Sequence, residues 1–160
     1  MAHNAVRLYV HLVWRTWDSL PLIRPAVERR LHRAIEAEAG ELGCKVYAVG
    51  GTAEHVHLLL AIPATLSVSD LVRQVKGASS RFANEVLLPG RFRWQGHYGA
   101  LSVSRSDVGR VRAYIQGQHD HHAVGGLVPE LEEVSSEGRA ETAASDSPTS
   151  AKADDQPEAQ

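Results

Sequence analysis

The sequence predicts an α+β protein built on a ferredoxin-like, split βαβ antiparallel sheet. Two segments, 6–14 and 55–62, are apolar and strand-like. Two others, 25–42 and 67–88, carry apolar residues at helical spacing. In chain order the expected elements are strand, helix, strand, strand, helix, strand and helix, which is the split βαβ order with an additional C-terminal helix.

The first half of the chain supplies four of these elements. Residues 6–14 alternate in hydrophobicity, as in a half-buried strand. Pro25 suits the first position of a helix and Gly43 supplies a left-handed stop, so a helix is expected over about 25–42. Residues 44–49 and 55–62 are expected to form a hairpin whose turn lies around Gly50 and Gly51.

The second half supplies the other three. Ser67 begins a capping-box-like sequence, and Pro89 and Gly90 end the helix that follows. A fourth strand is expected over 97–103. Ser106 then caps a last helix that turns Val108, Val111 and Ile115 inward and reaches residues 125–126.

Charge divides the chain into a folded body, 1–128, and an acidic tail, 129–160. The body holds 15 Lys and Arg against 10 Asp and Glu, and the tail holds 2 against 9. From Ser135 onward large apolar residues are nearly absent, so we expect the tail to be disordered. A mildly basic body suits a polyanionic partner, although an ordinary mixed surface has the same balance.

Cysteine content and hydropathy point to the cytoplasm. Cys44 is the single cysteine, so no intrachain disulfide can form. The N-terminus lacks a signal-peptide pattern, and no apolar run approaches the roughly 20 residues that a membrane span needs. We therefore expect a soluble cytoplasmic protein with no membrane partner, associated with the nucleoid when it binds DNA.

Two histidines mark the most informative segment. His55 and His57 lie two residues apart on an expected strand, so they share one face while Val56 and Leu58 pack on the other. Two neutral imidazoles side by side form half of a metal site. Ordinary histidines on the solvated side of a strand would have the same spacing, so the pair alone leaves both interpretations open.

The last helix carries a complementary pair, Tyr114 and Gln118, with His121 one turn further on. Their spacing places them on one face, which we expect to lie opposite the apolar stripe. The carbonyl oxygen of Gln118 could complete the coordination of a cation held by His55 and His57. A tyrosine beside such a cation suits covalent cleavage of a phosphodiester. A packing tyrosine and a solvated glutamine are the alternative interpretation.

These motifs together resemble the single-tyrosine HUH transposases, the enzymes of the smallest bacterial insertion sequences and their REP-associated tyrosine relatives. The resemblance covers about residues 5–122. Five segments carry it: YVHLVWR at 9–15, EHVHLL at 54–59, QVKG at 74–77, WQGHY at 94–98 and YIQGQH at 114–119. It implies that His55, His57 and Gln118 bind Mg²⁺ or Mn²⁺, and that Tyr114 is the nucleophile that becomes linked to a DNA 5′ phosphate.

The resemblance also implies the substrate and the assembly. The substrate would be single-stranded DNA with hairpins near the element ends. The protein would act as a homodimer, in which the tyrosine helix of one subunit can complete the histidine pair of the other. One departure from the family pattern is Gly117, which is expected inside the tyrosine helix and could keep that helix mobile.

Further DNA contacts are expected from cationic and aromatic residues. On the second helix Arg73 and Lys76 could meet phosphates, but a solvated helix face would look the same. Other cations lie near tryptophans, including Trp17, as a single-strand surface requires, although Trp94 could instead belong to the core. The residues concerned are Arg15, Arg73, Lys76, Arg91, Arg93 and Trp94.

Two other functions fit the same pattern. The fold also supports non-catalytic nucleic-acid binding, although the aromatic-rich strand signature of such modules is missing. The second alternative function is a metal-dependent nuclease that uses water as its nucleophile. In such an enzyme Tyr114 would only position the phosphate. Next to Gln118, the cluster His119, His121 and His122 could supply another ligand or a proton acceptor, or simply lie in solvent.

Overall fold

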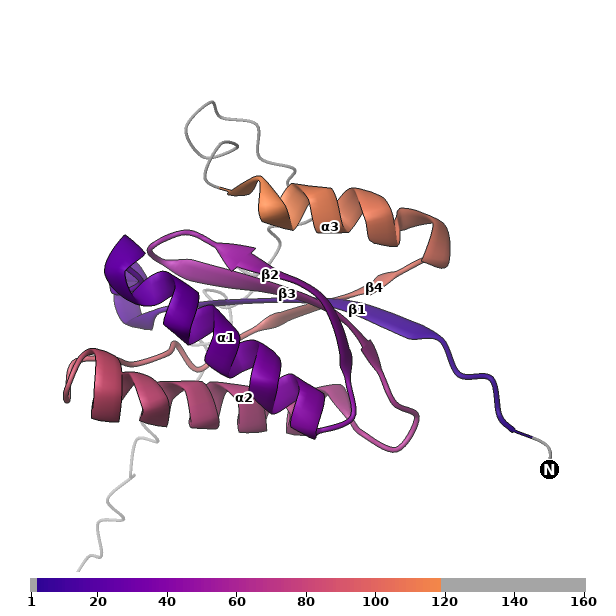
Figure 1. Cartoon of the computed structure of the whole chain (residues 1–160), viewed down its shortest axis with the longest axis horizontal. Coiled ribbons are helices and arrows are strands. Elements are labelled where there is room, and N and C mark those ends of the chain that lie inside the picture. Colours follow the sequence, from indigo (N-terminus) through magenta and orange to yellow (C-terminus); the bar gives the residue numbers. More distant parts are fainter. Residues whose placement is uncertain (1–2, 119–160) are drawn as a thin grey trace, which may run out of the picture.

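A four-stranded antiparallel sheet forms the centre of the protein in a computed structural model that describes residues 3–118. The strands lie in the order β2-β3-β1-β4 (Figure 1). Their bounds are β1 Leu8–Arg15, β2 Lys45–Gly51, β3 His55–Ile62 and β4 Gly99–Val103. This order confirms the ferredoxin-like sheet expected from the sequence.

Helices cover both faces of this sheet. Figure 1 shows α1 (Pro25–Glu41) and α2 (Val68–Phe82) side by side on one face, and α3 (Val108–Gln116) on the other. A π-helical turn, Ala83–Leu87, extends α2. Ser67 accepts a hydrogen bond from the backbone N–H of Asp70 and so caps α2 as expected. The sheet therefore has helices on both faces, and α3 lies on the face opposite α1 and α2.

The alternation of side chains along the strands produces two cores of unequal size. On the face of α1 and α2, Leu12 and Trp14 of β1 pack against Leu58 and Leu60 of β3. The core beneath α3 is smaller. It consists of Ala48, Leu59, Val111, Tyr114 and Ile115. The smaller core is the one that positions the histidines.

The structure corrects several expected boundaries. Val6 precedes β1, and its side chain is exposed, because the β1–β3 ladder begins only at Leu8. Gly50 and Gly51 belong to β2, so the hairpin turn lies at residues 52–54. Strand β4 begins at Gly99, two residues later than expected.

The last helix also differs from the expectation. α3 ends at Gln116, and Gly117 is its C-cap residue, with its N–H bonded to the carbonyl of Ala113. Gly117 therefore does not lie inside the helix. The argument that a helix-interior glycine keeps the tyrosine helix mobile does not apply to it. The expected continuation to 125–126 and the acidic tail, 129–160, lie outside the described residues. Within 3–118 no helix has the length and hydropathy needed to cross a membrane.

Candidate metal and tyrosine site

The two histidines of β3 lie under α3, side by side and buried. His55 is 2% exposed and His57 is fully buried. Their ring centroids are 4.9 Å apart at an interplanar angle of 74°. Val56 and Leu58 point into the opposite core, which confirms that the imidazoles share one face. Burial rules out the interpretation of these residues as ordinary histidines on a solvated strand face.

A glycine lets α3 approach this pair closely. Gly50 is the register partner of His57 in the β2–β3 ladder. A Cβ atom at Gly50 would collide with the backbone carbonyl of Ile115 and would lie 2.8 Å from its Cγ2. The backbone of α3 therefore rests directly on β2 beside His57, which only glycine permits.

α3 brings the tyrosine and the glutamine to the histidines. The ring of Tyr114 is edge-on to that of His57, with centroids 6.1 Å apart. Gln118 is 1% exposed, and its Oε1 lies 3.4 Å from His55 Nε2. The predicted residues thus converge within a single chain.

The expected orientation of α3 was wrong in one respect. Tyr114 lies on the same buried face as Val111 and Ile115, not opposite them. Positions 111, 114, 115 and 118 are spaced i, i+3, i+4 and i+7, so they form one helix face that packs on the sheet. The apolar stripe and the polar pair are therefore parts of one surface.

The spacing of one donor pair can be compared with that of two ligands on a small divalent cation. Ligands at about 2.1 Å from one ion lie about 3.0 Å apart in octahedral geometry and about 3.4 Å apart in tetrahedral geometry. The separation between His55 Nε2 and Gln118 Oε1 falls in this range. No group of three or more His, Cys, Asp or Glu within 3–118 is placed to hold a metal, so a site here would need an amide such as that of Gln118 as well.

Two contacts behind the histidines were not anticipated from the sequence. His55 Nδ1 lies 2.9 Å from Thr52 Oγ1, so the ring presents Nε2 to Gln118. His57 Nδ1 lies 2.8 Å from Nε2 of His11, a fully buried residue of β1. The sequence placed His11 in the YVHLVWR segment, on the strand face opposite Leu12, but the β1–β3 register that brings it to His57 cannot be read from spacing.

Two of the predicted DNA-binding residues have structural roles instead. Trp94 is 7% exposed and donates a hydrogen bond from Nε1 to Ser79 Oγ at 3.0 Å, so its ring cannot stack on a base at the surface. Lys76 donates to the carbonyls of Gln95 and His97. Burial lowers the pKa of the Lys76 ammonium. For Trp94 the structure favours the core interpretation that the sequence had left open, while Lys76 lies half-buried on α2.

The remaining predicted cations lie at the surface. Arg73 pairs with Asp70 at 3.2 Å on α2. Arg15 lies 4.0 Å from Glu54, and Arg91 is exposed. The Arg93 guanidinium stacks over Trp17, 3.8 Å from the centroid of its ring.

Trp17 stands at the edge of the site, on the turn that follows β1. It is 45% exposed, and its backbone N–H bonds to the carbonyl of Arg93. The next two residues, Asp18 and Ser19, have positive φ angles of 52° and 50°, a costly conformation for non-glycine residues. Arg15, two residues before Trp17, pairs with His55 in the sheet, so the chain leads from the histidines to this turn within two residues.

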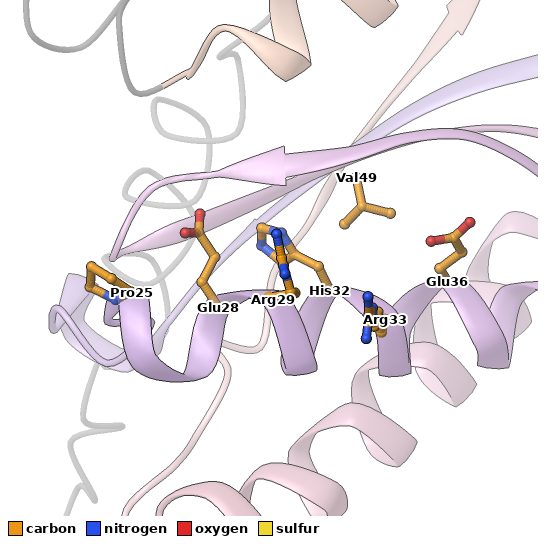
Figure 2. A pocket seen from close by; sticks show the side chains of 7 residues that line it. All are labelled: Pro25, Glu28, Arg29, His32, Arg33, Glu36 and Val49. Atoms are coloured by element: carbon orange, nitrogen blue, oxygen red, sulfur yellow. The ribbon is translucent and has the colours of Figure 1, made fainter.

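A separate cavity lies between α1 and β2. It has a volume of about 540 Å³ and is lined by Pro25, Glu28, Arg29, His32, Arg33, Glu36 and Val49 (Figure 2). Val49 packs against the core of α1 and α2, on the face of the sheet away from His57. This cavity is therefore not part of the histidine and tyrosine site.

The chain belongs to the IS200-like transposases, because the model of that family matches residues 4–118. Among individual proteins it is similar to the ISDra2 transposase TnpA of Deinococcus radiodurans. The two are 29% identical over 121 residues, which cover 71% of this chain and 86% of that protein.

Solved structures show the same fold. One is a crystal structure of a Deinococcus radiodurans R1 protein described as a transposase, with a TM-score of 0.61 and 25% identity, covering 74% of this chain and 95% of that one. Another is a REP-associated tyrosine transposase bound to a REP hairpin, with a TM-score of 0.57 and 13% identity. It covers 79% of this chain and 74% of its own. The assignment to single-tyrosine transposases made from the motifs is thereby confirmed.

Proposed function

We propose that this transposase cleaves and rejoins single-stranded DNA through attack of Tyr114 on a phosphodiester. A Mg²⁺ or Mn²⁺ ion held by His55, His57 and Gln118 would assist the reaction. The observation that supports this is the convergence of Tyr114 and Gln118 on the two buried imidazoles. Buried polar residues gathered around one point need a ligand or one another, and a cation satisfies the nitrogen and oxygen acceptors together.

The chemistry follows from the phenol. Its ordinary pKa is about 10, so only about one molecule in a thousand is ionised at neutral pH. A bound cation would polarise the phosphate and neutralise the charge that develops on its oxygens. As Tyr114 loses its proton, Oη bonds to phosphorus and the P–O3′ bond breaks. The 3′ hydroxyl leaves protonated, and the DNA 5′ phosphate stays on the tyrosine.

This intermediate favours strand transfer over hydrolysis. The phosphotyrosine conserves the energy of the broken ester, so a 3′ hydroxyl can later attack it and rejoin DNA without ATP. Tyr114 is 6% exposed in the chain without DNA. This burial requires α3 to move relative to β2 when DNA enters.

Hairpin-bearing single-stranded DNA is the proposed substrate. The fold it shares with a transposase bound to a REP hairpin supports this choice. Trp17, stacked with Arg93, offers an exposed ring and a cation for an unpaired base and its phosphate beside His55. Arg91 adds a second exposed cation near this surface.

The assembly we propose is a homodimer whose active sites each form within one subunit. Tyr114 already lies over His57 of its own chain. Exchange of tyrosine helices between subunits is therefore not needed to complete the site.

The test is covalent trapping. A single-stranded oligonucleotide with a hairpin is incubated with the protein and Mg²⁺ or Mn²⁺, then run on a denaturing gel. We expect a protein–DNA adduct that Tyr114→Phe abolishes together with cleavage. Tyr47→Phe is the matched control, because Tyr47 makes a ring contact with Tyr9 that phenylalanine preserves.

Each competing function predicts a different pattern of cleavage products and protein–DNA adducts on the gel. A nuclease that uses water would still cleave as Tyr114→Phe and would form no adduct. A non-catalytic binding module would shift the DNA on a native gel but cleave nothing in any variant. Either result would overturn the proposal.

A further inference from the structure

Both imidazoles of the site are held from behind through the same ring nitrogen. His57 Nδ1 contacts His11 Nε2 at 2.8 Å, and His55 Nδ1 contacts Thr52 Oγ1 at 2.9 Å. A metal ligand on either ring would therefore have to be Nε2. His11 lies on β1 and Thr52 lies in the turn between β2 and β3. Two independent contacts therefore fix Nδ1 of the two histidine rings.

We infer that His11 is a positioning residue that holds His57 in the tautomer protonated at Nδ1. This inference rests on the proposed metal site. A neutral imidazole has one donor and one acceptor nitrogen, so the bond between the two rings contains a single proton. If His57 donates it, His57 Nε2 carries the lone pair that a cation needs. If His11 donates it, the proton of His57 sits on Nε2 and blocks coordination.

The surroundings of the pair make this arrangement rigid. Both rings are fully buried, and they lie edge to edge in nearly the same plane, with centroids 5.0 Å apart at 21°, as a hydrogen bond between ring nitrogens requires. His11 stands opposite Leu59 in the β1–β3 ladder, diagonal to His57. Gly50, on the other side of His57, is covered by Ile115. His57 can therefore not turn its ring without displacing His11.

His11 acts through His57 and not as a further ligand. Its Nε2 is directed at Nδ1 of the neighbouring ring, at hydrogen-bond distance. An ion bound to His57 Nε2 lies on the far side of that ring. Outer partners of this kind orient metal-binding histidines, and their loss typically costs about 10- to 100-fold in metal affinity.

Three variants separate the hydrogen bond from packing. His11→Phe keeps an aromatic ring at this position but removes the nitrogen. His11→Gln is the conservative rescue, because its Oε1 can reach the position of Nε2 and accept the proton. Val13→Ala is the packing control, since Val13 is buried on the same strand and pairs with His57 in the register.

Two measurements are made on each full-length variant. Nitrogen chemical shifts of the His57 ring in the metal-free protein, recorded by NMR where the histidines are neutral, report which nitrogen carries the proton. Calorimetry with Mn²⁺ reports affinity. We expect Nδ1–H in the unmodified protein and in His11→Gln. In His11→Phe we expect a larger share of Nε2–H and an affinity lower by about 10- to 100-fold.

An unchanged tautomer and unchanged Mn²⁺ affinity in His11→Phe would overturn the inference. So would a loss in Val13→Ala as large as that in His11→Phe, because packing would then explain it. If His11→Phe does not fold, the unmodified protein still decides, since a proton on Nε2 of His57 contradicts the inference. Absence of Mn²⁺ binding in every form would overturn the proposed metal site, while the tautomer would still test His11.

Discussion

Gln118 Oε1 lies 3.4 Å from His55 Nε2, although 63 residues separate the two in the chain. The contact joins the residue that lies two positions after α3 to the first residue of β3. The role of Gln118 in metal binding can therefore be tested without changing Tyr114.

Replacing Gln118 with alanine should weaken metal binding. The loss of one of three protein ligands should reduce Mn²⁺ affinity by at least about 10-fold, as loss even of outer partners does. Gln118→Glu should bind Mn²⁺ more tightly, because a carboxylate adds charge. Gln116→Ala, which changes an exposed glutamine two residues earlier at the end of α3, is the control. Equal Mn²⁺ titrations of the Gln118→Ala and Gln116→Ala variants would exclude Gln118 as a ligand.

Adding a side chain at Gly50 should separate α3 from the histidines. In Gly50→Val the new atoms would meet the backbone of Ile115, so α3 must lift. We expect loss of the covalent DNA adduct with the β1–β3 sheet intact by circular dichroism.

Gly40→Ala is the matched control for Gly50, because nothing lies within 4 Å of its new methyl group. In a helix this change should stabilise the protein by about 0.5–1 kcal/mol, measured by urea unfolding. Full adduct formation by Gly50→Val would show that the close approach of α3 to β2 is dispensable.

Trp17 should contribute to the binding of single-stranded DNA. Loss of one stacked base costs about 1–3 kcal/mol, so Trp17→Ala should weaken binding roughly 5- to 150-fold in a fluorescence anisotropy titration. Trp17→Phe should retain most of the affinity. Leu20→Ala changes an equally exposed apolar residue of the same turn and should have little effect. A comparable loss in Leu20→Ala would point to the turn conformation as the cause.

Lys76 should matter for stability more than for DNA affinity. Lys76→Met leaves the carbonyls of Gln95 and His97 without their donor, which should cost about 1–3 kcal/mol in urea unfolding. Arg73→Met removes an exposed cation from the same helix and should change stability by less than about 0.5 kcal/mol. If Lys76→Met instead lowered the salt dependence of DNA binding at unchanged stability, Lys76 would be a phosphate contact.

Mixing two inactive variants should not restore activity if each site forms within one subunit. The test combines His57→Ala with Tyr114→Phe after joint refolding. Sites built from two chains would recover one intact histidine pair with one intact tyrosine. Adduct formation by the mixture, absent from either variant alone, would show that the tyrosine helices exchange.

Local pattern was enough to predict much of this protein. Period-two alternation placed His55 and His57 together on β3, and the four-residue interval placed Gln118 on the same side of the chain as Tyr114, although α3 ends two residues before Gln118. These are properties of single elements, whose geometry repeats along the chain. The motifs also carried the family assignment that the comparisons confirmed.

Contacts between elements had to come from the tertiary structure. The contact between His11 and His57 depends on the β1–β3 register. The close packing of α3 on β2 depends on the absence of a side chain at Gly50. The burial of Trp94 depends on how its loop crosses α2. By itself the sequence determined which side chains share a face. Only the tertiary structure decided which faces meet, because strand register and helix docking are set by packing between segments far apart in the chain.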